Sequence, residues 1–134
     1  MGGVLIYIRE DIPCKLINGS SFLHDFEGLF LEINLRKTRW LLFGGYNPHK
    51  SNIDAFLGKT GPVLEKNMTK LECFLIVGDF NSETCESSLI EFCQTYNLKN
   101  LVTGATCFKS VSNPSSIDLM LTNKPRNFLN NMII

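Results

Sequence analysis

The chain has 134 residues, 44% of them apolar, which is enough for one globular domain with a sizeable core and excludes an intrinsically disordered chain. Thirteen basic and thirteen acidic residues give a formal net charge of zero, so whole-chain charge gives no sign of nucleic-acid binding, although it leaves room for a local patch. Five cysteines without a CxxC pair predict reduced, mostly buried thiols in an intracellular, non-secreted protein, and no apolar run reaches membrane-spanning length.

The first part of the chain predicts three β-strands. Residues 4–9 are apolar and rich in β-formers, so they predict a strand that begins with almost no lead-in, as if the natural domain extended upstream. A Pro-containing turn and an edge segment follow. Residues 29–34 and 40–46 predict two further strands, and the basic cluster Arg36, Lys37 and Arg39 between them is interpreted as a solvated hairpin tip.

The second part alternates helices with strands. Ser51 or Asn52 is expected to cap a helix with apolar positions at helical spacing up to Leu71, and Gly61-Pro62 predicts a kink or two shorter helices. Residues 74–79 predict a strand covered on both faces, and residues 116–123 a final strand. Residues 86–96 predict a second helix, with four inward positions: Leu89, Ile90, Cys93 and Tyr96. The alternation indicates an α/β or α+β fold with layered sheet and helices.

Polar side chains gather where three of these strands end. Asp79 and Asn81 lie two residues apart in "GDFN", so an extended chain would point both to one side and turn Phe80 into the core. Tyr46 stands where a strand breaks at an Asn-Pro pair. Asp118 interrupts an apolar strand, which is costly unless the carboxylate is hydrogen-bonded or chemically active.

Each of these residues also has a purely structural interpretation. Asp79 and Asn81 fit an Asx-type turn that caps backbone groups, and Tyr46 fits a half-buried strand aromatic. Asp118 fits an ion pair with an arginine or a turn cap. Their occurrence together at strand ends favours a functional site, because a rigid sheet positions such groups.

Five segments in order resemble one family: "GGVLIYIREDIP", "GGYNPH", "IVGDFNSE", "GATCF" and "SSIDLMLTN". They resemble segments of the endonuclease/exonuclease/phosphatase superfamily, and within it the endonuclease domain of non-LTR retrotransposons. The resemblance runs across nearly the whole chain. It implies a four-layer α/β sandwich, two β-sheets flanked by helices, of which residues 1–134 form a partial domain.

The resemblance also implies a chemistry, the Mg²⁺-assisted hydrolysis of a phosphodiester. In it Tyr46 would hold its phenol against the phosphate, and Asp79 would activate the attacking water or bind the metal. Asn81 would bond the phosphate and orient Asp79. Asp118 matches the carboxylate that orients a catalytic histidine.

The implied substrate is DNA, which Thr106 and Ser116 would help to bind. This expectation comes from the retrotransposon-like segments, since charge adds nothing to it. The resemblance further implies an origin in fusion to a reverse transcriptase. Neither a membrane nor an oligomeric partner is expected.

The sequence departs from the family at both ends. The family has a metal-binding Glu upstream of the Gly-Gly segment and a phosphate-binding His in a terminal Ser-Asp-His, and neither is present; His24 and His49 do not substitute. Two functions therefore stay open: a retroelement-type endonuclease or related phosphodiesterase completed elsewhere, and a non-catalytic remnant. We predict that the 134-residue chain alone is inactive and prone to aggregation.

Overall fold

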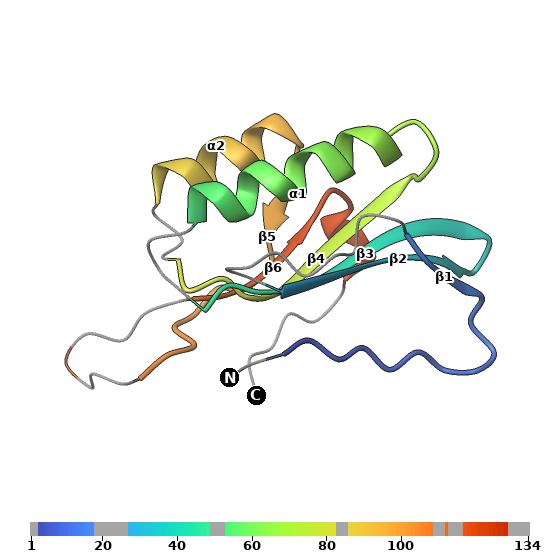
Figure 1. Cartoon of the computed structure of the whole chain (residues 1–134), viewed down its shortest axis with the longest axis horizontal. Helices are drawn as coiled ribbons and strands as arrows, with labels where there is room; N and C mark the ends of the chain where they lie inside the picture. Colours follow the sequence, from blue (N-terminus) through green and yellow to red (C-terminus); the bar gives the residue numbers. More distant parts are fainter. Residues whose placement is uncertain are drawn as a thin grey trace.

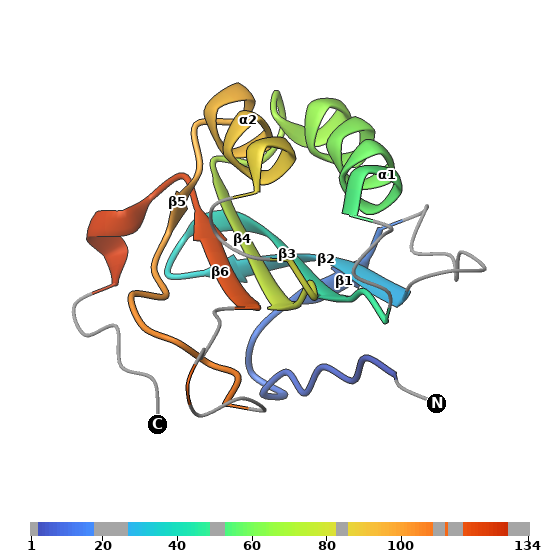
Figure 2. The same cartoon turned by 90° about the vertical axis from the view of Figure 1, so that its left-hand side faces the viewer.

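One mixed β-sheet with two helices on one face forms the body of the molecule (Figures 1 and 2). A computed structural model describes residues 3–17, 27–48, 53–82, 86–108, 112 and 117–128. The elements are β1 (Cys14–Leu16), β2 (Glu27–Leu35), β3 (Thr38–Tyr46), α1 (Ile53–Asn67), β4 (Cys73–Asp79), α2 (Ser87–Thr95), β5 (Lys99–Asn100), β6 (Asp118–Thr122) and the short 3₁₀-helix η2 (Pro125–Asn127). The strand order is β1-β2-β3-β4-β6-β5. The predicted α/β class is confirmed, and the described chain has one sheet and one helical layer.

The middle of the sheet combines a hairpin with a parallel pair. β2 and β3 pair antiparallel across a two-residue turn, in which Arg36 and Lys37 have φ angles of 51° and 66°. Positive φ at both positions is the type I′ geometry that matches the twist of a tight hairpin. β4 then lies parallel to β3, with α1 as the crossover, and β6 pairs antiparallel with β4.

The core lies between the sheet and the helices. Alternate strand residues point to the helices, so Phe43 of β3 stacks on Phe30 at 4.2 Å between ring centroids and contacts Phe56 of α1 at 5.8 Å. Phe56 in turn packs on Phe80 at 4.6 Å. Fully burying one such ring contributes about 1.5–3 kcal/mol. The strand residues that share this core are Phe30, Leu41, Phe43, Phe74, Ile76, Leu119 and Leu121.

The opposite face of the sheet is partly covered by the N-terminal segment, which crosses beneath the strands in Figure 2. Val4 and Ile6 pack there against Gly44, since a Cβ at residue 44 would lie 3.2 Å from Val4 Cγ1 and 2.9 Å from Ile6 Cδ1. The predicted strand over residues 4–9 is nevertheless wrong. The segment is extended, but among the described residues no strand pairs with its backbone.

Of the two alternatives expected at Gly61-Pro62, a kink or two shorter helices, the second is wrong, because α1 continues through both residues. Pro62 is exposed, so water can reach the helix carbonyl that its missing N–H leaves free. Gly61 is needed for helix packing: a Cβ there would lie 2.6 Å from the Tyr96 hydroxyl oxygen. That hydroxyl donates to Glu65 Oε1 at 2.9 Å and ties the two helices together.

The predicted inward face of α2 needs one correction. Leu89 is buried, and Cys93 and Tyr96 are half-buried against the core, but Ile90 is 45% exposed. Phe92, which was not predicted, takes its place in the core. The cysteines also differ in burial: Cys73 is buried, Cys93 and Cys107 are intermediate and Cys14 is exposed. None of the helices in the described ranges is long and apolar enough to cross a membrane. The expected caps Ser51 and Asn52 lie outside those ranges.

Candidate active site

Three residues predicted for the site lie side by side on three adjacent strands. Tyr46 of β3 is in register with Asp79 of β4, and Asp79 is in register with Asp118 of β6. Each sits at the end of its strand on the same edge of the sheet. The predicted convergence is therefore confirmed in geometry, and we call this set the carboxylate edge.

The three side chains point away from the helices. On each strand the neighbouring positions belong to the helix-side core, as with Phe80 beside Asp79 and Leu119 beside Asp118. Alternation along a strand then places Tyr46, Asp79 and Asp118 on the other face. All three are half-buried, so solvent or a ligand can reach them.

Asn81 forms a tight turn directly after Asp79. Its backbone N–H donates to Asp79 Oδ1 at 3.0 Å, which is the Asx-type turn foreseen as the structural interpretation. Its φ of 49° is the left-handed conformation that Asn tolerates better than most residues. The bond fixes the Asp79 carboxylate and leaves its second oxygen for other partners. The structural interpretation of this pair is therefore confirmed, and its functional role stays a prediction.

Asn47 completes the turn and was missed by sequence analysis. Its backbone N–H donates to the Asp79 carbonyl at 2.9 Å, and its own carbonyl accepts from Asn81 Nδ2 at 2.6 Å. Its fully buried side chain donates from Nδ2 to the Phe80 carbonyl at 3.0 Å. Asn47 thus clamps the end of β3 to the Asp79–Asn81 turn.

Thr106 positions the start of β6. Its hydroxyl oxygen accepts hydrogen bonds from the backbone N–H groups of Ile117 and Asp118 at 3.2 and 3.1 Å. The residue predicted to bind substrate therefore contacts the carboxylate edge through the backbone of Asp118. Ser116, the other predicted substrate-binding residue, lies outside the described residues.

Glu27 extends the row on its other side and was also missed. It pairs with Tyr46 across β2 and β3, so its side chain shares the face of the carboxylate edge. A Cβ at Gly3 would lie 3.5 Å from Glu27 Oε2, which places the start of the N-terminal segment over this carboxylate. The row thus reads Glu27, Tyr46, Asp79, Asp118 across four adjacent strands.

A divalent metal is chemically compatible with this edge. Carboxylate oxygens suit Mg²⁺, which commonly takes only one or two carboxylates and completes its shell with water and substrate phosphate oxygens. Asp79 and Asp118 are directly opposite like charges, an arrangement that destabilises a sheet unless a cation balances it. Within the described residues no three His, Cys, Asp or Glu side chains form a metal cluster. Asp79 is the residue that would hold such an ion.

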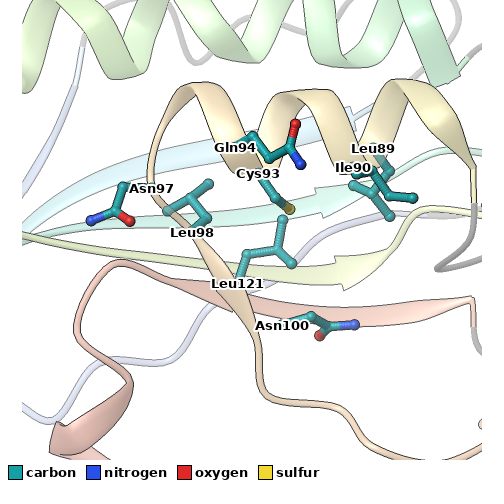
Figure 3. A pocket seen from close by; sticks show the side chains of 8 residues that line it. All are labelled: Leu89, Ile90, Cys93, Gln94, Asn97, Leu98, Asn100 and Leu121. Atoms are coloured by element: carbon teal, nitrogen blue, oxygen red, sulfur yellow. The ribbon is translucent and has the colours of Figure 1, made fainter.

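A pocket of about 500 Å³ lies elsewhere, between α2 and the β5–β6 edge (Figure 3). Cys93 of α2 and Leu121 of β6 point toward one another across it. Burial raises the pKa of the Cys93 thiol, so this group is poorly suited to act as a thiolate. None of the residues on the carboxylate edge lines this pocket.

Solved structures with this fold are found, although no family profile and no curated protein matches the sequence. The endonuclease domain of TRAS1, a telomere-specific non-LTR retrotransposon, matches with a TM-score of 0.65 and 16% identity, covering 83% of this chain and 54% of that one. The human Nocturnin catalytic domain matches with a TM-score of 0.57 and 13% identity, covering 83% and 48%. An endonuclease/exonuclease/phosphatase family protein from Leptotrichia buccalis C-1013-b matches at 0.56 and 16%, covering 72% and 41%.

The chain has the endonuclease/exonuclease/phosphatase fold. The resemblance found in the sequence is thereby confirmed for the fold, with a retrotransposon endonuclease domain among its matches. The chain spans about half the length of the structures it matches.

Proposed function

We propose that this chain supplies part of the active site of a Mg²⁺-dependent phosphodiester hydrolase of the retrotransposon endonuclease type, with DNA as its substrate. One observation carries the proposal: Tyr46, Asp79 and Asp118, far apart in the sequence, lie in one register row on one face of the sheet. A purely structural role for each would not require that they meet.

Asp79 is the proposed centre of the chemistry. One of its carboxylate oxygens is fixed by the Asn81 backbone N–H, and the other is left to orient a water or bind Mg²⁺. A base held in one orientation in this way accelerates a proton transfer by roughly 10²–10⁴-fold. Mg²⁺ would neutralise charge that develops on the phosphoryl oxygens.

The neighbours of Asp79 have supporting roles in this proposal. Tyr46 would contact the phosphate from β3, and Asn81 would offer its second side-chain N–H, since the first is held by the Asn47 carbonyl. Asp118 would orient a general acid or base on the other side. This partner would come from another segment, since neither His24 nor His49 matches the Ser-Asp-His segment that the resemblance implies.

A chimera tests the proposal. Residues 27–128 would replace the matching segment of the TRAS1 endonuclease domain, and nicking of supercoiled plasmid would be measured with Mg²⁺. We expect the chimera to nick DNA and Asp79→Asn to lower the rate by roughly 10²-fold or more. Asp54→Asn, an exposed carboxylate in the first turn of α1 on the helix side of the sheet, is the matched control. A folded chimera that nicks equally with and without Asp79 would disprove the proposal.

The sequence left a second function open, that of a non-catalytic remnant. The same chimera distinguishes the hydrolase from the non-catalytic remnant. Failure to nick, with TRAS1-like folding and Mg²⁺ present, would favour the remnant.

A further inference from the structure

Charge is separated along the strands, although the chain as a whole is neutral. The edge where β3 and β4 end holds Glu27, Asp79 and Asp118, and the described residues there include no lysine or arginine. At the other end of the sheet lie the β2–β3 turn and the α1–β4 connection, on the right in Figure 1. That end is strongly cationic. We call it the basic end and define it by six residues: Lys15, Arg36, Lys37, Lys66, Lys70 and Lys124.

Backbone contacts bring these cations together from separate elements. Lys70 follows α1, and its N–H donates to the Asn67 carbonyl, while Glu72 N–H joins this connection to Arg39 of β3 at 3.3 Å. Lys124 follows Asn123, whose side chain bonds the backbone of Phe74 and Glu72. All six cations are exposed.

The cations of the basic end outnumber the carboxylates that lie among them, which are Glu32, Glu65 and Glu72. Glu32 is engaged with Arg39, whose Nε lies 2.9 Å from its Oε1, and Asp11 is engaged with Arg9 in the same way. Within the described ranges no ion pair joins any of the six cations to a carboxylate. Lys15, Lys66 and Lys70 also line a shared groove of about 190 Å³ with Asn67 and with Glu32, whose carboxylate is engaged by Arg39. Such a groove suits an anionic oxygen-rich group.

The hairpin tip supplies an independent observation. Arg36 and Lys37 both have positive φ, where a type I′ turn prefers Asn followed by Gly. Two long cationic side chains at strained positions disfavour the turn for local reasons. Strained positions of this kind point to a function for the side chains that occupy them.

We propose that the basic end binds the sugar–phosphate backbone of nucleic acid, at a surface separate from the carboxylate edge. The end offers six cations, on β1, on turns and at a helix end, that form no ion pair within the described residues, which fits binding of a polyanion without base specificity. An anionic membrane fits less well, because the exposed apolar side chains at this end are scattered over separate elements, with Leu16 on β1, Leu35 on β2 and Met68 after α1. The proposal does not depend on catalysis at Asp79.

The test measures binding of a fluorescein-labelled duplex DNA by anisotropy in EDTA, over a range of salt concentrations. The key variant combines Arg36→Asn with Lys37→Gly, which removes two charges and gives the turn its preferred residues. We expect affinity to fall roughly tenfold and the salt dependence to lose about two phosphate contacts. We expect the melting temperature to rise, so that lost binding cannot be attributed to a damaged fold.

Matched single substitutions complete the test. Lys37→Gln should weaken DNA binding, whereas Lys59→Gln, in the exposed middle of α1 and away from the basic end, should leave it unchanged. The proposal is overturned if the double variant binds DNA like the unaltered chain, or if Lys59→Gln weakens binding equally. Binding to vesicles of phosphatidylserine and phosphatidylcholine in preference to DNA would also overturn it.

Discussion

Gly78 approaches Gly45 so closely that a Cβ at residue 78 would lie 1.8 Å from the Gly45 carbonyl oxygen. Gly78 also has a φ of +150°, which side-chain-bearing residues rarely adopt. The pair immediately precedes Tyr46 and Asp79, so this contact sets the spacing of β3 and β4 at the carboxylate edge.

Gly78→Ala is therefore expected to destabilise the fold by about 3 kcal/mol or more, because backbone atoms cannot move aside as a flexible side chain would. Gly58→Ala is the matched control, since Gly58 lies in α1 with nothing within 4 Å of its Cβ position. We expect Gly58→Ala to raise the free energy of unfolding by about 0.5–1 kcal/mol, because alanine has the better helix propensity. Urea unfolding curves would measure both, and equal effects would contradict the close approach.

The Asn47 clamp gives a second prediction. Asn47→Ala removes the donor to the Phe80 carbonyl inside the core, and we expect a loss of about 2 kcal/mol. Asn67→Ala removes a bond of similar kind, Nδ2 to the Val63 carbonyl at 2.7 Å, but at a half-buried helix end. Asn67→Ala should lower the free energy of unfolding by less than Asn47→Ala, because water can replace the lost hydrogen bond. A larger loss for Asn67→Ala in thermal unfolding would show that Asn47 is not a clamp.

The opposed carboxylates give a third prediction. Asp118→Asn should stabilise the metal-free protein by about 0.5 kcal/mol, because it removes a like-charge pair with Asp79. The same change should reduce the rise in melting temperature caused by Mg²⁺, since an ion stabilises the state that binds it. Glu72→Gln, an exposed carboxylate at the other end of the sheet, should change neither quantity. Identical Mg²⁺ shifts in all three proteins would argue against metal binding at this edge.

Thiol reactivity gives a prediction about pH. Burial raises the pKa of the Cys93 thiol, so its thiolate should form only at pH values above those typical of an exposed cysteine. The protonated form is favoured in the folded state, so this group's contribution to stability is complete below the unfolded pKa of about 8.5 and is lost as pH rises above it. Labelling with a thiol reagent at rising pH should modify Cys14 before Cys93. Early labelling of Cys93 in folded protein, checked by peptide mapping, would contradict this.

Solution behaviour follows from the N-terminal segment. Leu5 is 73% exposed and Tyr7 is 88% exposed on its outer side, next to backbone groups that no described strand pairs. Such edges promote association between copies. Leu5→Lys with Tyr7→Lys should raise the monomer fraction in size-exclusion chromatography, whereas Ile90→Lys, an exposed position on α2, should have less effect. A clean monomer without any substitution would contradict the predicted aggregation.

The residues that sequence analysis located correctly are those with a local signal. Asp79 and Asp118 follow or interrupt apolar alternation, so their strands and the faces they occupy follow from the two-residue period. Asn47 was missed because an Asn before Pro has the pattern of an ordinary turn. Glu27 was missed because its importance lies in its register with Tyr46, which depends on pairing between strands.

The wrong predictions have tertiary causes. Residues 4–9 have the composition of a strand, but pairing requires a neighbouring backbone, which composition does not specify. Gly61-Pro62 has the local pattern of a helix break, yet contact with Tyr96 favours Gly at that position, and exposure makes Pro62 tolerable. Ile90 fits the helical period of the core, but Phe92 fills the space under α2.

The pairing of Tyr46, Asp79 and Asp118 across three strands also determines when the candidate site can form during folding. The β2–β3 hairpin is local and can form within about 1–10 μs, which places Tyr46 early. Asp79 reaches its place only after the α1 crossover has brought β4 alongside β3. Asp118 follows when β6 pairs between β4 and β5. Non-local pairings of this kind are slow. A ribosome-bound chain that has been released only as far as residue 117 can therefore hold the hairpin, β4 and both helices, but its carboxylate edge still lacks Asp118.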